Sequence, residues 1–376
     1  MSRPNVDIDK FKTRLQKRGL MVVNEIRSKT EHYVILEVQP RSGSVKSALY
    51  SVKNSADPDL STAEIKFASK LNQCVPSIND PEFANQLNLQ QINFSEMRCL
   101  LEAKNVSQVA QPRLTIIDSG CTPVSNEWTN ITQFNFVGGL DGVPEAAGDP
   151  QVHGTAVAAI AAATTNNGIL LAGVASHTAP SVALTCCRVS NAAGQIDTID
   201  VIRALNWCVD HQAERGGPSA INLSIQSFGL PTYNGSELIQ DIAKMLSKHK
   251  DILINAAGND PIEDPSKSKK TIRRVGGIDE NDMYWTQSTY GPFKAVAPSV
   301  NVRTYSNAIS TAASGSGTSY AAPHWSGAIA LLMSLEPKLT PAKADQLLYK
   351  TGKETSQGYI VPDLRAAVIK ALKLKP

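Results

Sequence analysis

Short apolar runs alternate with helical patterns through most of the chain. Five runs have strand length, and each is followed by a loop or a helical pattern: LTII from Leu114, VALTCC from Val182, AINLSI from Ala220, ILINAA from Ile252 and KAVAP from Lys294. Apolar strands that alternate with helices predict an α/β fold, in which helices cover both faces of a parallel sheet. The predicted helices span residues 153–163, 199–211, 236–248, 319–335 and 340–351.

The first hundred residues have a different pattern, which predicts a small α/β domain. Its expected elements are a helix over 6–18, strands over 19–28 and 31–40, and a helix over 61–73. The polar segment 75–110 is expected to be a loosely structured connection with short helices. We therefore expect a small domain with its linker over residues 1–105 and a larger domain over 106–376.

Composition narrows the class of protein. The chain has 376 residues, 42% of them hydrophobic and 19% charged, as in globular proteins. A net charge of +3 is too small to indicate nucleic acid or an anionic membrane as a partner. No signal peptide and no transmembrane span is recognisable in the sequence, so a cytoplasmic location is expected. The six scattered cysteines are then expected to be free thiols, and no CxxC pair indicates a metal site.

Four polar residues stand at the ends of strand-like runs or at the starts of helices. Asp118 follows LTII, His153 opens a helix, Asn259 ends the segment ILINAAGND, and Ser319 begins an apolar helix. Sites on parallel sheets form at the carboxyl ends of strands, which is where these residues are expected. Each residue alone has an ordinary explanation as a turn residue or a helix cap.

Together the four residues have what acyl transfer requires. Ser319 would attack a carbonyl carbon, and His153 would take its proton and return it to the leaving group. Asp118 would orient the imidazole and stabilise its protonated form. The Asn259 amide and the backbone N–H of Ser319 would bind the oxyanion.

The sequence resembles the subtilisin-like serine proteases, or subtilases. The matching segments are IIDSG, HGTAVA, INLSI, NAAGND and GTSYAAPHWSGAIALL, and the resemblance runs from about Leu114 to about Lys350. It implies a three-layer parallel-sheet catalytic domain and a serine endopeptidase that cleaves protein or peptide substrates without a cofactor for the chemistry. It also implies that His324, which follows the nucleophile in a Pro-His pair, packs within its helix and is not a second base.

Residue by residue, the resemblance assigns the triad to Asp118, His153 and Ser319, and the oxyanion asparagine to Asn259.

The resemblance also implies where substrate binds. Ser224, Ile225 and Gln226 match the strand that pairs with an extended substrate, and main-chain pairing suits a polypeptide. Gln226 stands where the family usually has glycine, so its side chain is expected to crowd the groove or add a polar contact. Gly276 and Gly277 match the region that forms the other wall of the specificity pocket.

A structural calcium ion is a further possibility implied by the resemblance. Asn167 lies in a loop like the one that binds calcium in many subtilases, and Glu127 lies near the position of a completing carboxylate. Calcium prefers oxygen ligands, but only one carboxylate is visible here. An ordinary surface loop is the alternative.

Several alternatives stay open on the sequence alone. The N-terminal domain is either a propeptide that caps the groove or a permanent domain for recognition, and autoinhibition is possible in both cases. A catalytically silent binding protein and a peptide transpeptidase or cyclase are the competing functions. The basic run 267–274 is expected to be a solvated loop, and Cys121 a buried structural thiol.

Overall fold

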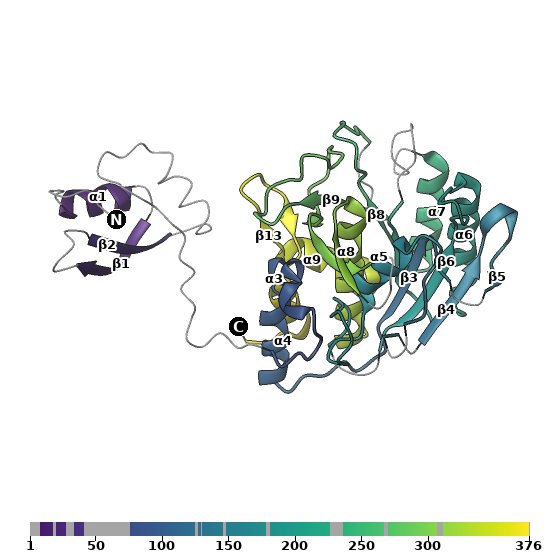
Figure 1. Cartoon of the computed structure of the whole chain (residues 1–376), viewed down its shortest axis with the longest axis horizontal. Helices are drawn as coiled ribbons and strands as arrows, with labels where there is room; N and C mark the ends of the chain where they lie inside the picture. Colours follow the sequence, from purple (N-terminus) through teal and green to yellow (C-terminus); the bar gives the residue numbers. More distant parts are fainter. Residues whose placement is uncertain are drawn as a thin grey trace. The chain divides into compact units, whose positions relative to one another are not determined.

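The protein is described from a computed structural model (Figure 1). It describes residues 8–17, 20–27, 34–40, 76–124, 127–128, 130–145, 148–177, 181–225, 236–266, 270–306 and 311–375. The chain divides into two compact units, residues 1–73 and 74–376. The division comes earlier than the predicted boundary after residue 105, because the segment that follows it packs into the second unit.

The first unit contains a helix and a strand pair. Helix α1 spans Ile8–Lys17, and strands β1 (Leu20–Arg27) and β2 (Val34–Pro40) pair antiparallel with Leu20 opposite Pro40. These elements agree with the predicted helix and strands. The predicted helix over 61–73 lies outside the described residues.

The second unit is built on an eight-stranded sheet with the order β10-β9-β8-β7-β3-β6-β4-β5. All neighbours pair in parallel except β4 and β5. The parallel sheet is therefore confirmed, although β4, β5 and β9 were not among the predicted runs. The strands are β3 (Arg113–Asp118), β4 (Asn130–Asn135), β5 (Val143–Pro144), β6 (Ala183–Arg188), β7 (Ala220–Leu223), β8 (Ile252–Ala256), β9 (Ile272–Ile278) and β10 (Val296–Pro298).

Helices cover both faces of this sheet, as predicted. Alternate side chains of a strand point to opposite faces, so Ile116 and Ile254 join one core cluster while Ile117 and Leu253 join the other. The first cluster includes side chains of α5 and α8, and the second those of α6 and α7. These helices are α5 (His153–Ala162), α6 (Thr198–Asp210), α7 (Glu237–Lys248) and α8 (Thr318–Leu335).

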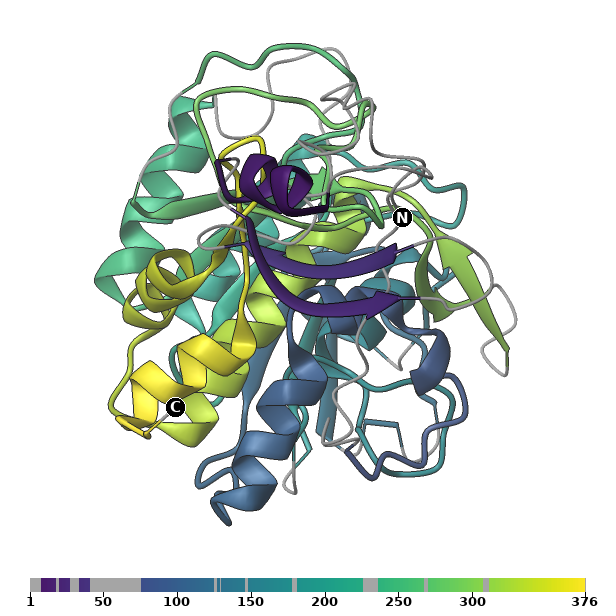
Figure 2. The same cartoon turned by 90° about the vertical axis from the view of Figure 1, so that its left-hand side faces the viewer.

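The segment between the two predicted domains is packed, which corrects the expectation of a loose connection. It forms η1 (Phe83–Asn85), α3 (Leu87–Gln91) and α4 (Phe94–Ala103). Phe94, Met97 and Leu101 of α4 are fully buried in the same core as α5 and α8. Helix α4 lies beside α10 (Figure 2), and the Leu364 N–H donates to the Ile92 carbonyl over 3.0 Å.

The remaining elements are η2 (Val137–Gly139), α9 (Pro341–Thr351), α10 (Leu364–Leu372) and two hairpins, β11 (Val302–Tyr305) with β12 (Ala312–Gly315) and β13 (Lys353–Glu354) with β14 (Ile360–Val361). Among the described residues, no helix combines the length and the apolarity needed to cross a membrane.

Two sequence expectations about cysteines and cations are wrong in part. Cys121 and Cys186 form a disulfide, and Cys99 is also disulfide-bonded, whereas Cys187 and Cys208 are free and buried. The basic run is no solvated loop where it enters β9. Its two arginines are paired with Asp345 and with Asp264.

Candidate active site

The predicted orienting carboxylate lies at the carboxyl end of the interior strand β3. Asp118 is 2% exposed. Its Oδ1 accepts hydrogen bonds from the backbone N–H of Ser119 over 2.7 Å and from the Ser119 hydroxyl over 3.2 Å. The same oxygen lies 2.7 Å from Nδ1 of His153. A carboxylate held by several donors has little freedom to move, so it can fix the ring that contacts it.

His153 is the first residue of α5, and two features place it there. The preceding Val152 adopts a left-handed conformation with φ 59°, which is strained for a β-branched residue. The Asp149 carboxylate then caps the helix, because its Oδ2 accepts from the backbone N–H and the hydroxyl of Thr155, each over 2.7 Å. Asp149 was not among the predicted site residues, because it lies four positions before His153 and the N-cap position itself is Val152.

The pKa of His153 is raised above its ordinary value. Partial burial lowers this pKa, but the charge and hydrogen bond of Asp118, together with the charge of Asp149, outweigh it. The His153 side chain is 36% exposed, so the ring stays open to a reacting group.

A general base must be neutral, so we expect kcat/KM to fall as the pH drops through the raised pKa of His153. Replacing Asp149 by asparagine removes a charge that favours the imidazolium, which should move the acid limb to lower pH. Activity against pH for the wild type and Asp149→Asn measures both effects. An unchanged or higher acid limb in the variant would contradict the assigned influence of Asp149.

Helix α5 approaches β3 so closely that position 154 must be glycine. The Gly154 N–H donates to the Ser119 hydroxyl over 2.9 Å. A Cβ added at Gly154 would lie 2.1 Å from the Gly120 carbonyl oxygen and 3.1 Å from Cβ of Asp118. The contact is with backbone, so one of the two elements would have to shift.

Gly154→Ala is therefore expected to displace His153 from Asp118 and to lower kcat/KM at least tenfold, since about 1 Å of misplacement is enough for larger losses. Gly148→Ala is the matched control, because nothing lies within 4 Å of a Cβ added there. Kinetics and thermal melting of both variants test the expectation. Equal activity of the two variants would show that the close approach has no influence on the site.

The predicted nucleophile lies in the first turn of α8. Ser319 is half-buried, and its hydroxyl donates to the Ser224 carbonyl over 3.1 Å. Among the described residues, no hydrogen bond joins Ser319 to His153. The His153 ring does lie near the same turn, with its centre 6.1 Å from that of the Tyr320 ring. Hydrogen bonds of this kind often form only when substrate is bound.

Asn259 is held against the start of the same helix. Its Oδ1 accepts from the backbone N–H of Thr318 over 2.8 Å and from the Thr318 hydroxyl over 2.9 Å. These two donors fix the orientation of the amide, so its NH₂ end is the one that can donate to an oxyanion. Sequence reasoning did not identify Thr318, which makes this contact with Asn259.

The predicted substrate strand is described only in part. Ser224 donates its hydroxyl to the Ser319 carbonyl over 2.8 Å, and Ile225 is 6% exposed. Gln226 lies outside the described residues, so its effect on the groove stays a prediction. Gly276 and Gly277 are buried in β9, and their role as a pocket wall also stays a prediction. His324 is fully buried, which agrees with a packing role.

The predicted calcium ligands meet, but not as ligands. The Asn167 Nδ2 donates to Glu127 Oε2 over 2.8 Å, and its Oδ1 accepts from the Ile169 N–H over 2.8 Å. Burial raises the pKa of Glu127 to about 7, against the opposing hydrogen bond from Asn167. Among the described residues, no cluster of three metal-binding side chains occurs. These two residues alone do not supply the roughly six to eight oxygens that a calcium ion takes.

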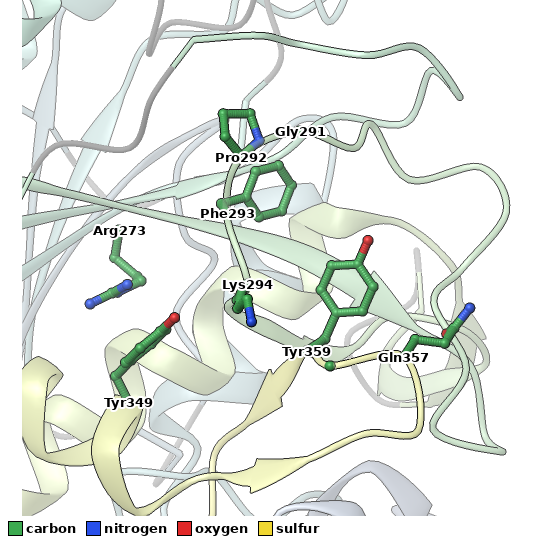
Figure 3. Close-up of a pocket in the computed structure, with 9 residues that line it drawn as sticks. Arg273, Gly291, Pro292, Phe293, Lys294, Tyr349, Gln357 and Tyr359 are labelled. Carbon is green, nitrogen blue, oxygen red and sulfur yellow. The ribbon is translucent and has the colours of Figure 1, made fainter.

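A surface pocket of about 570 Å³ shares no residue with this site (Figure 3). Its lining includes Arg273, Lys294, Tyr349 and Tyr359. The Arg273 guanidinium makes two hydrogen bonds to Asp345, of 2.7 and 2.6 Å, and lies 4.7 Å from the centre of the Tyr349 ring. This cation is already paired, and the pair links β9, which contains Arg273, to α9, which contains Asp345.

The fold and this arrangement define a class: a parallel-sheet α/β protein with a serine at a helix start and a partly exposed histidine held by a buried aspartate. The family model described as the subtilase family matches residues 112–364, and the chain belongs to that family. It is accordingly a serine endopeptidase, which hydrolyses peptide bonds in protein or peptide substrates.

Individual relatives agree with this assignment. Subtilisin DY from Bacillus licheniformis is 29% identical over 260 residues, which cover 66% of this chain and 86% of the relative. Subtilisin Savinase from Lederbergia lenta is 33% identical over 211 residues, covering 54% of this chain and 72% of the relative. A solved protease from Pseudoalteromonas arctica has the same fold, with a TM-score of 0.65, 24% identity, and coverage of 79% of this chain and 100% of that one.

Proposed function

We propose that the chain hydrolyses peptide bonds through an acyl-enzyme formed on Ser319. His153 takes the proton of the hydroxyl as Oγ attacks the carbonyl carbon, and it protonates the leaving amine. Water then attacks the acyl carbon, with His153 again as the base. Asp118 holds the ring and stabilises its charged form, and Asn259 with the Ser319 N–H binds the oxyanion.

The observation that carries this proposal is the distance of 2.7 Å between Asp118 Oδ1 and His153 Nδ1. A hydrogen bond there leaves Nε2 as the basic nitrogen, on the side of the ring away from Asp118. The raised pKa of His153 supports the same roles, because a stabilised imidazolium is the proton donor that the leaving amine needs.

The test separates hydrolysis from ligation and from silent binding. A fluorophosphonate probe should label Ser319, as located by mass spectrometry of the digested protein. Casein cleaved in H₂¹⁸O should yield new carboxyl termini that contain ¹⁸O. Unlabelled cyclic or ligated products would indicate a transpeptidase, and neither labelling nor cleavage would indicate a silent binding protein.

The cellular location and the role of the first unit stay predictions. The Cys121–Cys186 disulfide favours an oxidising compartment, against the cytoplasmic location expected from the sequence. Mass measurement of the incubated protein, with Ser319→Ala as the control, would show whether the first unit is cut off.

A further inference from the structure

The loop after α5 is bound by a carboxylate from the segment that precedes α3. Asp80 is 4% exposed. Its Oδ2 accepts from the Asn166 N–H over 2.7 Å, and its Oδ1 accepts from the N–H groups of Asn167 and Gly168 over 3.1 and 3.2 Å. Three consecutive backbone N–H groups that converge on one carboxylate form an anion-binding arrangement.

Neighbouring residues extend this contact along the segment. The Asn79 side chain accepts from Gly168 N over 2.8 Å, and the Asn79 N–H donates to the Asn166 side chain over 3.0 Å. Two further pairs continue the contact. The Glu82 N–H donates to the Leu170 carbonyl over 2.9 Å. The Gln86 side-chain amide donates to the Ala172 carbonyl and accepts from the Ala172 N–H, each over 2.8 Å. The loop is therefore bound along its length by the chain itself.

The polarity of this contact is opposite to that of a cation site. A calcium ion needs carbonyl and carboxylate oxygens that point inward. Here the loop presents N–H donors, and the Leu170 carbonyl already accepts a hydrogen bond. Burial raises the pKa of Asp80, while the three N–H groups and the charge of the nearby Arg98 act in the opposite direction. The Asp80 carboxylate thus finds its positive partners in backbone N–H groups and in Arg98, where a metal ion would otherwise provide the positive charge.

We propose that the Asp80 carboxylate holds the loop Asn166–Gly168 in the place of a metal ion. The loop of this catalytic unit is then fixed by the chain's own preceding segment, without calcium. The segment 79–86 is then a permanent part of the catalytic unit. A cut that removes the first unit must leave Asp80 attached to α3 for the loop to stay in place.

The experiment uses the full chain carrying Ser319→Ala, which prevents self-digestion from affecting the result. Thermal melting is compared in EDTA and in millimolar CaCl₂, and hydrogen exchange is followed by mass spectrometry in peptides that cover residues 164–171. We expect the same Tm within about 1 °C in both conditions. Asp80→Asn should lower the Tm by about 5 °C and speed exchange in those peptides at least tenfold, as rough sizes for lost charge-assisted hydrogen bonds.

Asp141→Asn is the matched control, because Asp141 is an exposed aspartate of the same unit. It should change neither the Tm nor the exchange. A rise of several degrees with calcium, or slower exchange of the loop with calcium, would overturn the proposal. So would unchanged exchange in Asp80→Asn. If Asp80→Asn does not fold, the comparison of EDTA with calcium in the parent chain still decides the matter.

Discussion

Replacing Ser319 by alanine is expected to lower kcat by about a million-fold, an effect known for subtilisin and carried over from that relative. The substitution removes the oxygen that would form the acyl bond, whereas Asp118 and His153 keep their contact. The Ser319 hydroxyl makes one hydrogen bond, to the Ser224 carbonyl, so the free energy of unfolding should fall by only about 1 kcal/mol. Hydrolysis of a chromogenic peptide and thermal melting measure the two quantities.

Ser314→Ala provides the control for this prediction. Ser314 is exposed in β12, a few residues before the nucleophile, and belongs to the same stretch of small residues. Its replacement should leave both kcat and fluorophosphonate labelling as in the wild type. If Ser319→Ala still cleaves the peptide after contaminating proteases have been removed, the nucleophile is another group.

The sequence was most informative where chemistry and periodicity agreed. The parallel sheet follows from apolar runs that alternate with helical patterns, and Asp118 and His153 meet because the carboxyl end of β3 lies against the start of α5. The start of α8 was also predictable, since glycines and small residues precede a long apolar helix. The Ser319–Asn259 region follows from the same rule that sites lie at the carboxyl ends of parallel strands.

Interactions between distant segments explain what the sequence did not predict. Strand β9 contains Arg273 and Arg274, which look like part of a solvated basic run in the sequence. In the fold they are paired with Asp345 and Asp264. Arg274 is fully buried, which no local pattern indicates for a cation. The Cys121–Cys186 disulfide joins residues 65 positions apart, and spacing alone does not give such a pairing.

Helix α4 and the Asp80 contact illustrate the same limit. Phe94, Met97 and Leu101 lie among polar residues, so their segment was interpreted as a connection, yet they share one buried helix face. The three N–H groups that donate to the Asp80 carboxylate come from a loop 86 to 88 residues away. A carboxylate whose donors are all distant looks like a surface residue in the sequence.

Asn259→Ala is expected to lower kcat by roughly a hundred- to a thousand-fold while KM changes little; the magnitude is known for subtilisin and is carried over from it. The amide should contact the oxygen mainly when it becomes an oxyanion, so the loss falls on the transition state. The orientation of Asn259 supports an oxyanion role, because Thr318 binds its Oδ1 and leaves Nδ2 as the donor end. This Nδ2 lies near Gly317, since a Cβ added there would be 3.5 Å from it. Steady-state kinetics on one peptide separates kcat from KM.

Two further variants separate charge from position. Asn259→Asp should be less active than Asn259→Ala, because a carboxylate repels the developing negative charge. Thr318→Val removes the hydroxyl that donates to Asn259 but keeps the backbone N–H, so its kcat should lie between those of the wild type and Asn259→Ala. Asn259→Ala also removes the acceptor of the N–H and the hydroxyl of the buried Thr318, so its Tm should fall by a few degrees beside the loss of kcat. If Asn259→Ala raises KM and leaves kcat intact, the amide binds substrate in its ground state and is not the oxyanion donor.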